Sequence, residues 1–400
     1  MQLFEIVGAV EGKNILLLQG PMGSFFNTLD QIFTRHGART FRIGLNAGDA
    51  YFADADHFTP YKDTPQQWEC FIEEFYRTHA IDMLFVFGDC RFYQEKAIQK
   101  AQEAGVTVFV FEEGYIRPDF ITLEQEGVNK HSSLPRERAF YEALESHGEM
   151  ECNKKNIRSI GSTYGRMAWQ AIVYYLIGNL FSYKYPHYVH HKAFSAFWEG
   201  FYGVRNFLRK YLYKITEAGA LKKFETTLAK RYYFVAIQTH DDFQIKKHSP
   251  YDTIEEFLEE VLYSFCKHAP KESFLVFKHH PMDRGKKNYK PFLKKMARRL
   301  GCEERIHILY DLHLPTLLKH AIATVTVNST VGISSLYHAT PVICLGDSLY
   351  DIEGLTSKGI SLDAFWQNYT EVDYELFEKF RCYLIKTTQI NGSFYTAHPF

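Results

Sequence analysis

The sequence predicts an α/β protein with two doubly wound halves that face a cleft. Short apolar runs alternate along the chain with segments whose apolar residues recur at helical spacing, which is typical of strands and helices in turn. Most of the apolar runs end in a glycine or a polar loop, and open α/β sheets bind their ligands at the carboxyl ends of their strands. The alternation occurs twice, on either side of a basic, aromatic segment at residues 156–230.

Four parallel strands are predicted in the first half, residues 1–155. The runs that predict them are residues 14–19, 40–45, 82–87 and 106–111. A helix is predicted after the first run, because Phe26, Leu29 and Phe33 lie at helical spacing. Strands that alternate with helices form a parallel sheet, so the loops that follow these strands are expected to meet at one edge.

Five further strands are predicted in the second half, residues 231–372. The runs that predict them are residues 232–238, 273–277, 306–310, 321–327 and 341–345. Asp252 and Glu255 form a capping pattern before an amphipathic helix that ends near Phe265. Residues 373–400 are expected to form a helix and a tail that pack back on the first half. Two Rossmann-like halves around a cleft describe a GT-B-like architecture.

The segment between the halves, residues 156–230, differs in composition from both. From residue 156 to residue 231 the chain holds twelve Lys and Arg against three acids, and fifteen aromatic residues lie between Trp169 and Tyr213. Interleaved basic and aromatic residues suit a helical surface at the headgroup level of an anionic membrane. A helical insertion whose aromatic residues pack inward is the alternative.

Composition excludes several classes of protein. The chain has 400 residues, 46% of them hydrophobic, so two domains can each bury a core, and its net charge of −1 argues against nucleic acid as a partner. The seven cysteines never occur as a CxxC pair, which predicts a reduced, cytoplasmic chain without a structural zinc site. The first residues lack secretory-signal features, and the longest apolar stretch, residues 167–181, falls short of the roughly 20 residues that span a bilayer.

Two histidines follow the predicted strand 273–277, in the run Lys278-His279-His280-Pro281. A histidine that donates to a phosphate oxygen helps a nucleotide to leave without a metal ion. We assign this role to His280, whose loop Pro281 restrains, whereas His279 is better interpreted as a packing residue. Asn328-Ser329-Thr330 comes where another strand turns into a helix, so these residues either bind a phosphate at the helix start or simply cap it.

Paired carboxylates follow one strand in each half, as Glu112-Glu113 and as Asp241-Asp242. Successive residues that leave a strand point in different directions, so one carboxylate of each pair is expected to face the cleft. Two such carboxylates would serve double displacement at a sugar, one as nucleophile and one as acid/base. Solvated loop acids are the alternative.

Six motifs in the same order along the chain resemble the KpsS/LipB family of capsule polysaccharide proteins. The motifs are Gln19-Gly20-Pro21-Met22-Gly23, Phe87-Gly88-Asp89-Cys90-Arg91, Glu112-Glu113-Gly114-Tyr115-Ile116-Arg117-Pro118, Tyr188-Val189-His190-His191-Lys192, the run from Lys278 to Gly285, and Tyr350-Asp351-Ile352-Glu353-Gly354-Leu355-Thr356. The resemblance extends over essentially the whole chain.

This resemblance implies a retaining β-Kdo transferase of Gram-negative bacteria. The implied donor is CMP-Kdo, and the implied acceptor is phosphatidylglycerol or its lyso form at the cytoplasmic face of the inner membrane, where the enzyme would start a poly-Kdo linker. A companion capsule β-Kdo transferase and the export machinery are implied as partners, and no metal or other cofactor is expected. It also favours the membrane interpretation of residues 156–230, because a lipid acceptor keeps its acyl chains in the bilayer.

The resemblance assigns roles to individual residues as well. Glu112 is the implied acid/base with Glu113 in reserve, and Asp242 is the implied nucleophile. The implied nucleotide-sugar contacts are Gln238, Lys278, His280, Pro281, Asn328, Ser329, Thr330 and Gly332. The implied acceptor contacts are Gln19, Gly20, Pro21, Asp89 and Arg117, although Gln19 and Arg117 could instead only shape their loops. Arg205, Arg209 and Lys210 are expected to face the membrane.

Two other functions stay open. A transferase that moves glycerol phosphate or another group from a cytidine nucleotide would use the same fold and phosphate site. A non-catalytic component of capsule export or assembly is the alternative from another class of protein.

Overall fold

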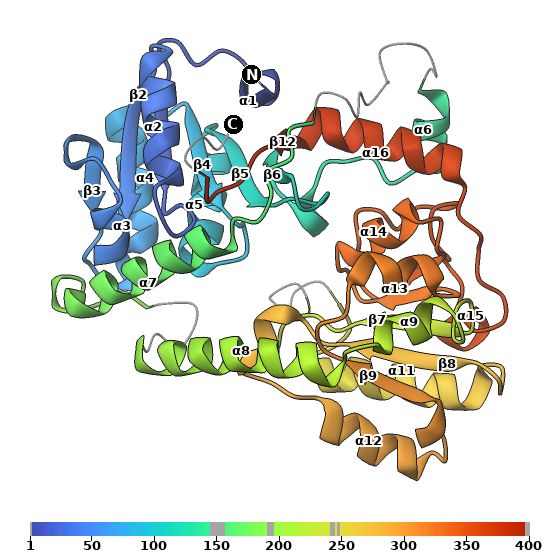
Figure 1. Ribbon diagram of the computed structural model, residues 1–400. Coiled ribbons are helices and arrows are strands. Elements are labelled where there is room, and N and C mark those ends of the chain that lie inside the picture. Colours follow the sequence, from blue (N-terminus) through green and yellow to red (C-terminus); the bar gives the residue numbers. More distant parts are fainter. Residues whose placement is uncertain (1, 145–156, 190–195, 241–244, 246–248, 397–400) are drawn as a thin grey trace. The chain divides into compact units, whose positions relative to one another are not determined.

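The computed structural model describes residues 2–144, 157–189, 196–240, 245 and 249–396 (Figure 1). The chain divides into two compact units. Unit 1 comprises Met1–Ser133, Cys152–Ala196 and Tyr383–Phe400, and unit 2 comprises Leu134–Glu151 and Phe197–Cys382. Each unit has its own sheet, and the predicted α/β class with parallel sheets is confirmed.

The sheet of unit 1 has seven strands in the order β12-β6-β5-β4-β1-β2-β3. The strands are β1 (Asn14–Leu18), β2 (Arg39–Gly44), β3 (Phe58–Pro60), β4 (Met83–Phe87), β5 (Thr107–Glu113), β6 (Phe120–Gln125) and β12 (Gln389–Asn391). The four predicted strands are present and parallel. Beyond the predicted strands, β6 pairs antiparallel with β5 and β12 pairs antiparallel with β6, so these two strands extend one edge of the sheet.

Helices cover both faces of this sheet, which explains why its strands are apolar throughout. The helices of unit 1 are α1 (Gln2–Val7), α2 (Phe25–Arg35), α3 (Ala47–Tyr51), α4 (Trp68–His79), α5 (Phe92–Glu103) and α7 (Tyr164–Leu180). Alternate residues of β1 enter different cores: Leu16 packs with Trp68 of α4, whereas Leu17 packs with Phe33 of α2.

Unit 2 contains a five-stranded parallel sheet in the order β11-β10-β7-β8-β9. Its strands are β7 (Tyr232–Ala236), β8 (Phe274–Lys278), β9 (Ile306–Leu309), β10 (Thr324–Thr326) and β11 (Val342–Cys344), so all five predicted strands are present. Its helices are α6 (Arg138–Ala143), α8 (Ala196–Thr216), α9 (Ala220–Glu225), α11 (Ile254–His268), α12 (Lys290–Arg299), α13 (Leu314–His320), α14 (Val331–Tyr337), α15 (Leu362–Phe365) and α16 (Tyr374–Thr388), the last of which continues into unit 1.

Two local expectations need correction. Thr253 rather than Asp252 caps α11, since its extended backbone lets Oγ1 accept from the N–H of Glu256 at 3.3 Å. The basic, aromatic residues 156–230 form no unit of their own, because α7 belongs to unit 1 whereas α8 and α9 belong to unit 2. Among the helices of the described residues, we find none with the length and apolar character needed to cross a membrane.

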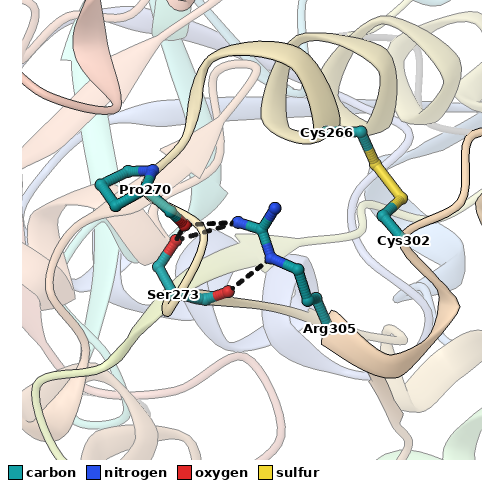
Figure 2. Close-up of a disulfide and its surroundings, with 5 residues drawn as sticks. All are labelled: Cys266, Pro270, Ser273, Cys302 and Arg305. Atoms are coloured by element: carbon teal, nitrogen blue, oxygen red, sulfur yellow. Dashed lines mark hydrogen bonds between the residues drawn. A yellow bond between two sulfur atoms is a disulfide. The ribbon is translucent and has the colours of Figure 1, made fainter.

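A disulfide joins Cys266 of α11 to Cys302, which follows α12 (Figure 2). The two Cα atoms lie 6.1 Å apart although the residues are 36 positions apart in sequence. Beside this bond, Arg305 donates to the carbonyl oxygens of Pro270 and Ser273 at 2.6 and 2.9 Å. The expectation that all cysteines are reduced is therefore wrong for this pair, because only the packing of α11 against α12 brings the two thiols together.

Candidate functional site

Strand order brings the predicted nucleotide loops of unit 2 together. In this sheet β7 lies between β10 and β8, so the loop after β7 is flanked by the Asn328 loop and the His280 loop at the same edge. The sequence of strands reverses direction between β7 and β10, and ligands of open α/β sheets bind at such a switch point.

Hydrogen bonds connect the loops on both sides of β7. The side-chain amide of Gln238 donates to Asn328 Oδ1 at 3.0 Å, and its Oε1 accepts from the backbone N–H of Asn328 at 3.4 Å. Asp283 accepts from the backbone N–H of His240 at 2.9 Å and lies 2.7 Å from His240 Nδ1. Asp283 is buried, so this pair holds the β7 loop against the His280 loop. The proposed nucleophile Asp242 lies outside the described residues.

The two adjacent histidines have different surroundings. His280 begins the short 3-10 helix Pro281–Gly285, and its Nδ1 accepts from the N–H of Met282 at 3.2 Å. The neutral ring therefore carries its proton on Nε2, the atom that can donate to a ligand. His279 is buried, with Nδ1 3.3 Å from the carbonyl of Leu309 and Nε2 accepting from the N–H of Tyr289 at 2.9 Å. Burial lowers the pKa of His279 to about 4, so His279 is a neutral framework residue.

Two other predicted nucleotide contacts, Lys278 and Gly332, hydrogen-bond or pack within unit 2. Lys278 is buried, its Nζ donates to the carbonyl of Tyr310 at 3.4 Å, and burial lowers its pKa, so its assignment as a nucleotide contact stays a prediction. Gly332 is explained by packing, because a Cβ there would lie 2.2 Å from the hydroxyl of Tyr350. That hydroxyl donates to the carbonyl of Ser329 at 2.5 Å.

Ser329 and Thr330 lie at the start of α14 and remain partly exposed. Ser329 Oγ accepts from the N–H of Val331 at 3.3 Å, so it performs part of the capping that the sequence offered as the alternative to phosphate binding. Thr330 is the N-cap residue, yet its side chain makes no capping hydrogen bond.

In unit 1, Glu112 and Glu113 end strand β5, which lies between β4 and β6. Their side chains point in opposite directions along the pleat. Glu112 Oε1 accepts from the N–H of Glu113 at 2.9 Å. Desolvation raises the pKa of Glu112 to about 7, helped by the charges of Glu113 and Asp89 and opposed by that hydrogen bond and by Arg91. A carboxyl group with this pKa can release and accept a proton near neutral pH.

The glycine of the Glu112-Glu113-Gly114 motif is required by the turn between β5 and β6. A Cβ at Gly114 would lie 2.0 Å from the carbonyl oxygen of Phe120, so no other residue fits here without moving the strand that follows. Arg117, three residues further on, is exposed, and its Nε donates to the carbonyl of Gly114 at 3.2 Å. Arg117 thus shapes this turn while its guanidinium stays accessible.

Gln19 belongs to a buried network rather than to an open surface. Its side-chain amide donates to Asp49 Oδ2 at 3.0 Å and to the hydroxyl of Tyr188 at 3.2 Å, and its Oε1 accepts from Gln94 at 3.0 Å. The other oxygen of Asp49 accepts from Tyr174 of α7 at 2.9 Å, and burial raises the pKa of Asp49. These bonds favour the alternative that Gln19 shapes its loop, and through Asp49 they link this loop to α7. The neighbouring Gly20 is likewise required by packing, since a Cβ would lie 2.5 Å from the Phe26 ring; Pro21 is buried.

The carboxylate of Asp89 is also hydrogen-bonded within unit 1. Its Oδ2 accepts from the N–H of Val128 at 3.2 Å and lies 3.0 Å from His131 Nδ1, and its Oδ1 accepts from Cys90 Sγ at 3.1 Å. These bonds explain its burial, and its assignment as an acceptor contact stays a prediction. Possible metal-ligating atoms of Asp89, Cys90 and His131 lie within 4.8 Å of one another, and Asp89 already hydrogen-bonds both Cys90 and His131.

One face of α8 supports the His280 loop, a feature that sequence analysis missed. Asn206 donates to the carbonyl of Pro281 at 3.3 Å and accepts from Arg284 Nη1 at 3.1 Å. Arg209 donates to the carbonyl of Arg284 at 2.6 Å, so the expectation that its charge simply faces a membrane needs correction. Arg284 also pairs with Asp311. No spacing pattern could reveal these contacts, because the partners are about 75 positions apart.

These features describe a two-unit α/β protein with polar loops at the strand ends of each sheet, and the chain belongs to the family of capsule polysaccharide biosynthesis proteins. The model of that family matches residues 82–395. The resemblance to KpsS and LipB that the six motifs predict is confirmed.

Curated relatives match almost the whole chain. The capsule polysaccharide export protein KpsS of Escherichia coli is 40% identical over 386 residues, which are 96% of this chain and 98% of KpsS. The capsule polysaccharide modification protein LipB of Neisseria meningitidis serogroup A is 37% identical over 396 residues, 96% of this chain and 92% of LipB. Among solved structures, the β-Kdo 2,7 transferase KpsC of Thermosulfurimonas dismutans covers 92% of this chain and 89% of its own, with 13% identity and a TM-score of 0.42.

Proposed function

We propose that the protein is a retaining glycosyltransferase that moves Kdo from CMP-β-Kdo to phosphatidylglycerol or its lyso form. The product would start the poly-Kdo linker of a Gram-negative capsular polysaccharide at the cytoplasmic face of the inner membrane. The observation that carries the proposal is Glu112, a carboxyl group at a strand end with its pKa raised to about 7. Membership of the capsule family supports the substrate class.

Double displacement explains how a β-linked donor gives a β-linked product. In the first step the carboxylate of Asp242 attacks the anomeric carbon of Kdo, and CMP leaves with the electron pair of the broken C–O bond. In the second step the acceptor hydroxyl attacks the same carbon, its proton passes to the ionised Glu112, and the bond to Asp242 breaks. The two inversions restore the β configuration.

His280 is proposed to stabilise the departing cytidylate. Its Nε2–H, defined by the hydrogen bond that Nδ1 accepts from Met282, would donate to a phosphate oxygen as negative charge develops there. Ser329 and Thr330 are proposed to donate hydroxyl hydrogen bonds to the same phosphate. No metal enters this scheme, so EDTA is expected to leave the transfer rate unchanged.

The direct test combines purified protein, CMP-Kdo and a fluorescent phosphatidylglycerol or lyso-phosphatidylglycerol, with mass spectrometry of the lipid. A mass gain of one Kdo is expected, and Glu112→Gln should slow it by about a hundredfold or more. Glu103→Gln is the matched control, because Glu103 is an exposed carboxylate on α5 of the same unit.

Two outcomes would overturn the proposal. Transfer of glycerol phosphate or another group from a cytidine nucleotide, with CMP-Kdo inert, would assign a different donor. Failure of every donor, together with intact binding to capsule transporter proteins, would favour the non-catalytic export component.

A further inference from the structure

The helix α8 of unit 2 has an outer face made of large apolar side chains. These side chains are spaced along one side of the helix and are each about half exposed or more: Phe201, Val204, Leu208, Tyr211, Leu212 and Ile215. Val204, Leu208 and Ile215 are 62%, 63% and 73% exposed. Several large apolar residues in one exposed row are unusual for the free surface of a soluble domain and mark an interaction site.

The opposite face of the same helix is held by the rest of unit 2. Asn206 and Arg209 hydrogen-bond the His280 loop, and the ring of Tyr213 stacks on Tyr310 with centroids 4.0 Å apart. The carbonyl of Tyr202 lies against Gly285, where a Cβ would come within 2.3 Å of it. The helix therefore cannot turn its apolar row inward without breaking these contacts, so the row is left for a partner from outside unit 2.

The charges beside the apolar row indicate what that partner is. Lys214 is exposed and Arg205 is half-buried, and on helical geometry they lie on the two sides of the row, whereas the exposed Lys210 lies further round the helix. Residues 200–216 contain no Asp or Glu. An apolar arc between basic margins is the arrangement of helices that lie in the interface of an anionic bilayer. In a second copy of the chain, the same face would oppose cation to cation.

We propose that the outer face of α8 is the membrane-docking surface of unit 2, and that its partner is a bilayer rich in anionic phospholipid. The apolar row would enter the headgroup region while Lys214 and Arg205 meet lipid phosphate. This inference rests on the proposed function, which requires an acceptor whose acyl chains stay in a membrane. In this proposal the apolar row of α8, rather than Arg209, contacts the membrane.

Vesicle sedimentation tests the surface directly. The full-length protein is mixed with vesicles of phosphatidylcholine alone or of phosphatidylcholine with phosphatidylglycerol, at low and high salt. We expect binding only to the anionic vesicles, weakened by salt, and at least tenfold weaker for the double variant Leu208→Asn/Leu212→Asn. The matched control is Tyr263→Asn, which removes an equally exposed ring, 47% exposed, from α11 of the same unit.

A second readout separates loss of docking from loss of folding or of catalysis. CMP binding and transfer to a water-soluble, short-chain acceptor should be the same in the double variant and the wild type, because the two leucines lie opposite the His280 loop. Vesicle binding by the double variant equal to wild type would overturn the inference. So would loss of self-association with vesicle binding intact, which would make the face a contact between copies. Wild-type protein that binds vesicles through α8 but transfers no sugar would overturn only the proposed function.

Discussion

The carboxylate of Asp283 binds His240 twice, accepting from its backbone N–H at 2.9 Å and lying 2.7 Å from its ring Nδ1. His240 belongs to the loop after β7 and Asp283 to the 3-10 helix after His280, so one buried side chain sets the spacing of two predicted nucleotide loops. The hydrogen bonds between Asp283 and His240 therefore connect the loop after β7 with the loop after β8, beside the residues proposed to bind phosphate.

Replacing Asp283 by Asn is expected to weaken both nucleotide binding and the fold. The neutral amide loses the charge-assisted bond to the ring, which should cost about 1–3 kcal/mol of the free energy of unfolding. CMP affinity, measured by calorimetry, should fall by about tenfold as the β7 loop loosens. Asp252→Asn, at an exposed acid of the same unit, should change neither quantity. Unchanged affinity in Asp283→Asn would contradict the shared-loop interpretation.

The raised pKa of Glu112 predicts that stability and transfer rate change in opposite directions with pH. Both changes should occur between the ordinary pKa of 4.5 and the raised pKa of about 7. The folded protein holds the proton more tightly than the unfolded chain does, so this group's contribution to the free energy of unfolding falls as pH rises through that range. Over the same range the carboxylate becomes available as a base, so the transfer rate should rise and level off above about pH 7. Denaturant titrations and initial rates from pH 5 to 8.5 measure the two slopes. Glu112→Gln should remove the stability slope and lower the rate about a hundredfold or more.

Substitutions of the two adjacent histidines should have different effects: a change at His280 should lower the transfer rate, and a change at His279 should lower the stability. In His280→Asn the new amide oxygen can still accept from Met282, so the melting temperature should stay while the transfer rate falls by about a hundredfold. In His279→Ala the N–H of Tyr289 and the carbonyl of Leu309 lose a buried partner, which should cost about 1–3 kcal/mol of stability. His313→Asn, at an exposed histidine, is the control. A large loss of stability in His280→Asn would contradict the assigned role.

Asn206 should act as a positioning residue for the His280 loop. Asn206→Ala removes the bonds to Pro281 and Arg284, so the loop becomes less ordered and the KM for the donor should rise about fivefold to tenfold, with a smaller effect on kcat. Leu208→Ala is the control on the outer face of the same helix and should leave donor KM unchanged. Equal effects of the two substitutions would indicate a general loss of helix α8 instead.

Local sequence patterns predicted most of the framework. Apolar runs located the strands of both parallel sheets, because a strand buried on both faces must be apolar along its length. The antiparallel pairing of β6 with β5 and β12 was missed, since pairing direction at a sheet edge depends on where the chain returns. The disulfide between Cys266 and Cys302 was missed for a similar reason.

What the sequence by itself determined was the set of polar loops at strand ends and the family to which they belong. Only the tertiary structure decided which side chains in those loops are buried and hydrogen-bonded within their own unit. Gln19, Asp89 and Lys278 look like ligand contacts in a motif, yet each is buried and hydrogen-bonds other parts of its unit. Glu112 keeps a raised pKa because desolvation outweighs its hydrogen bond to Glu113. The roles of these side chains depend on burial and on partners far away in the sequence, and the local spacing of residues predicts neither.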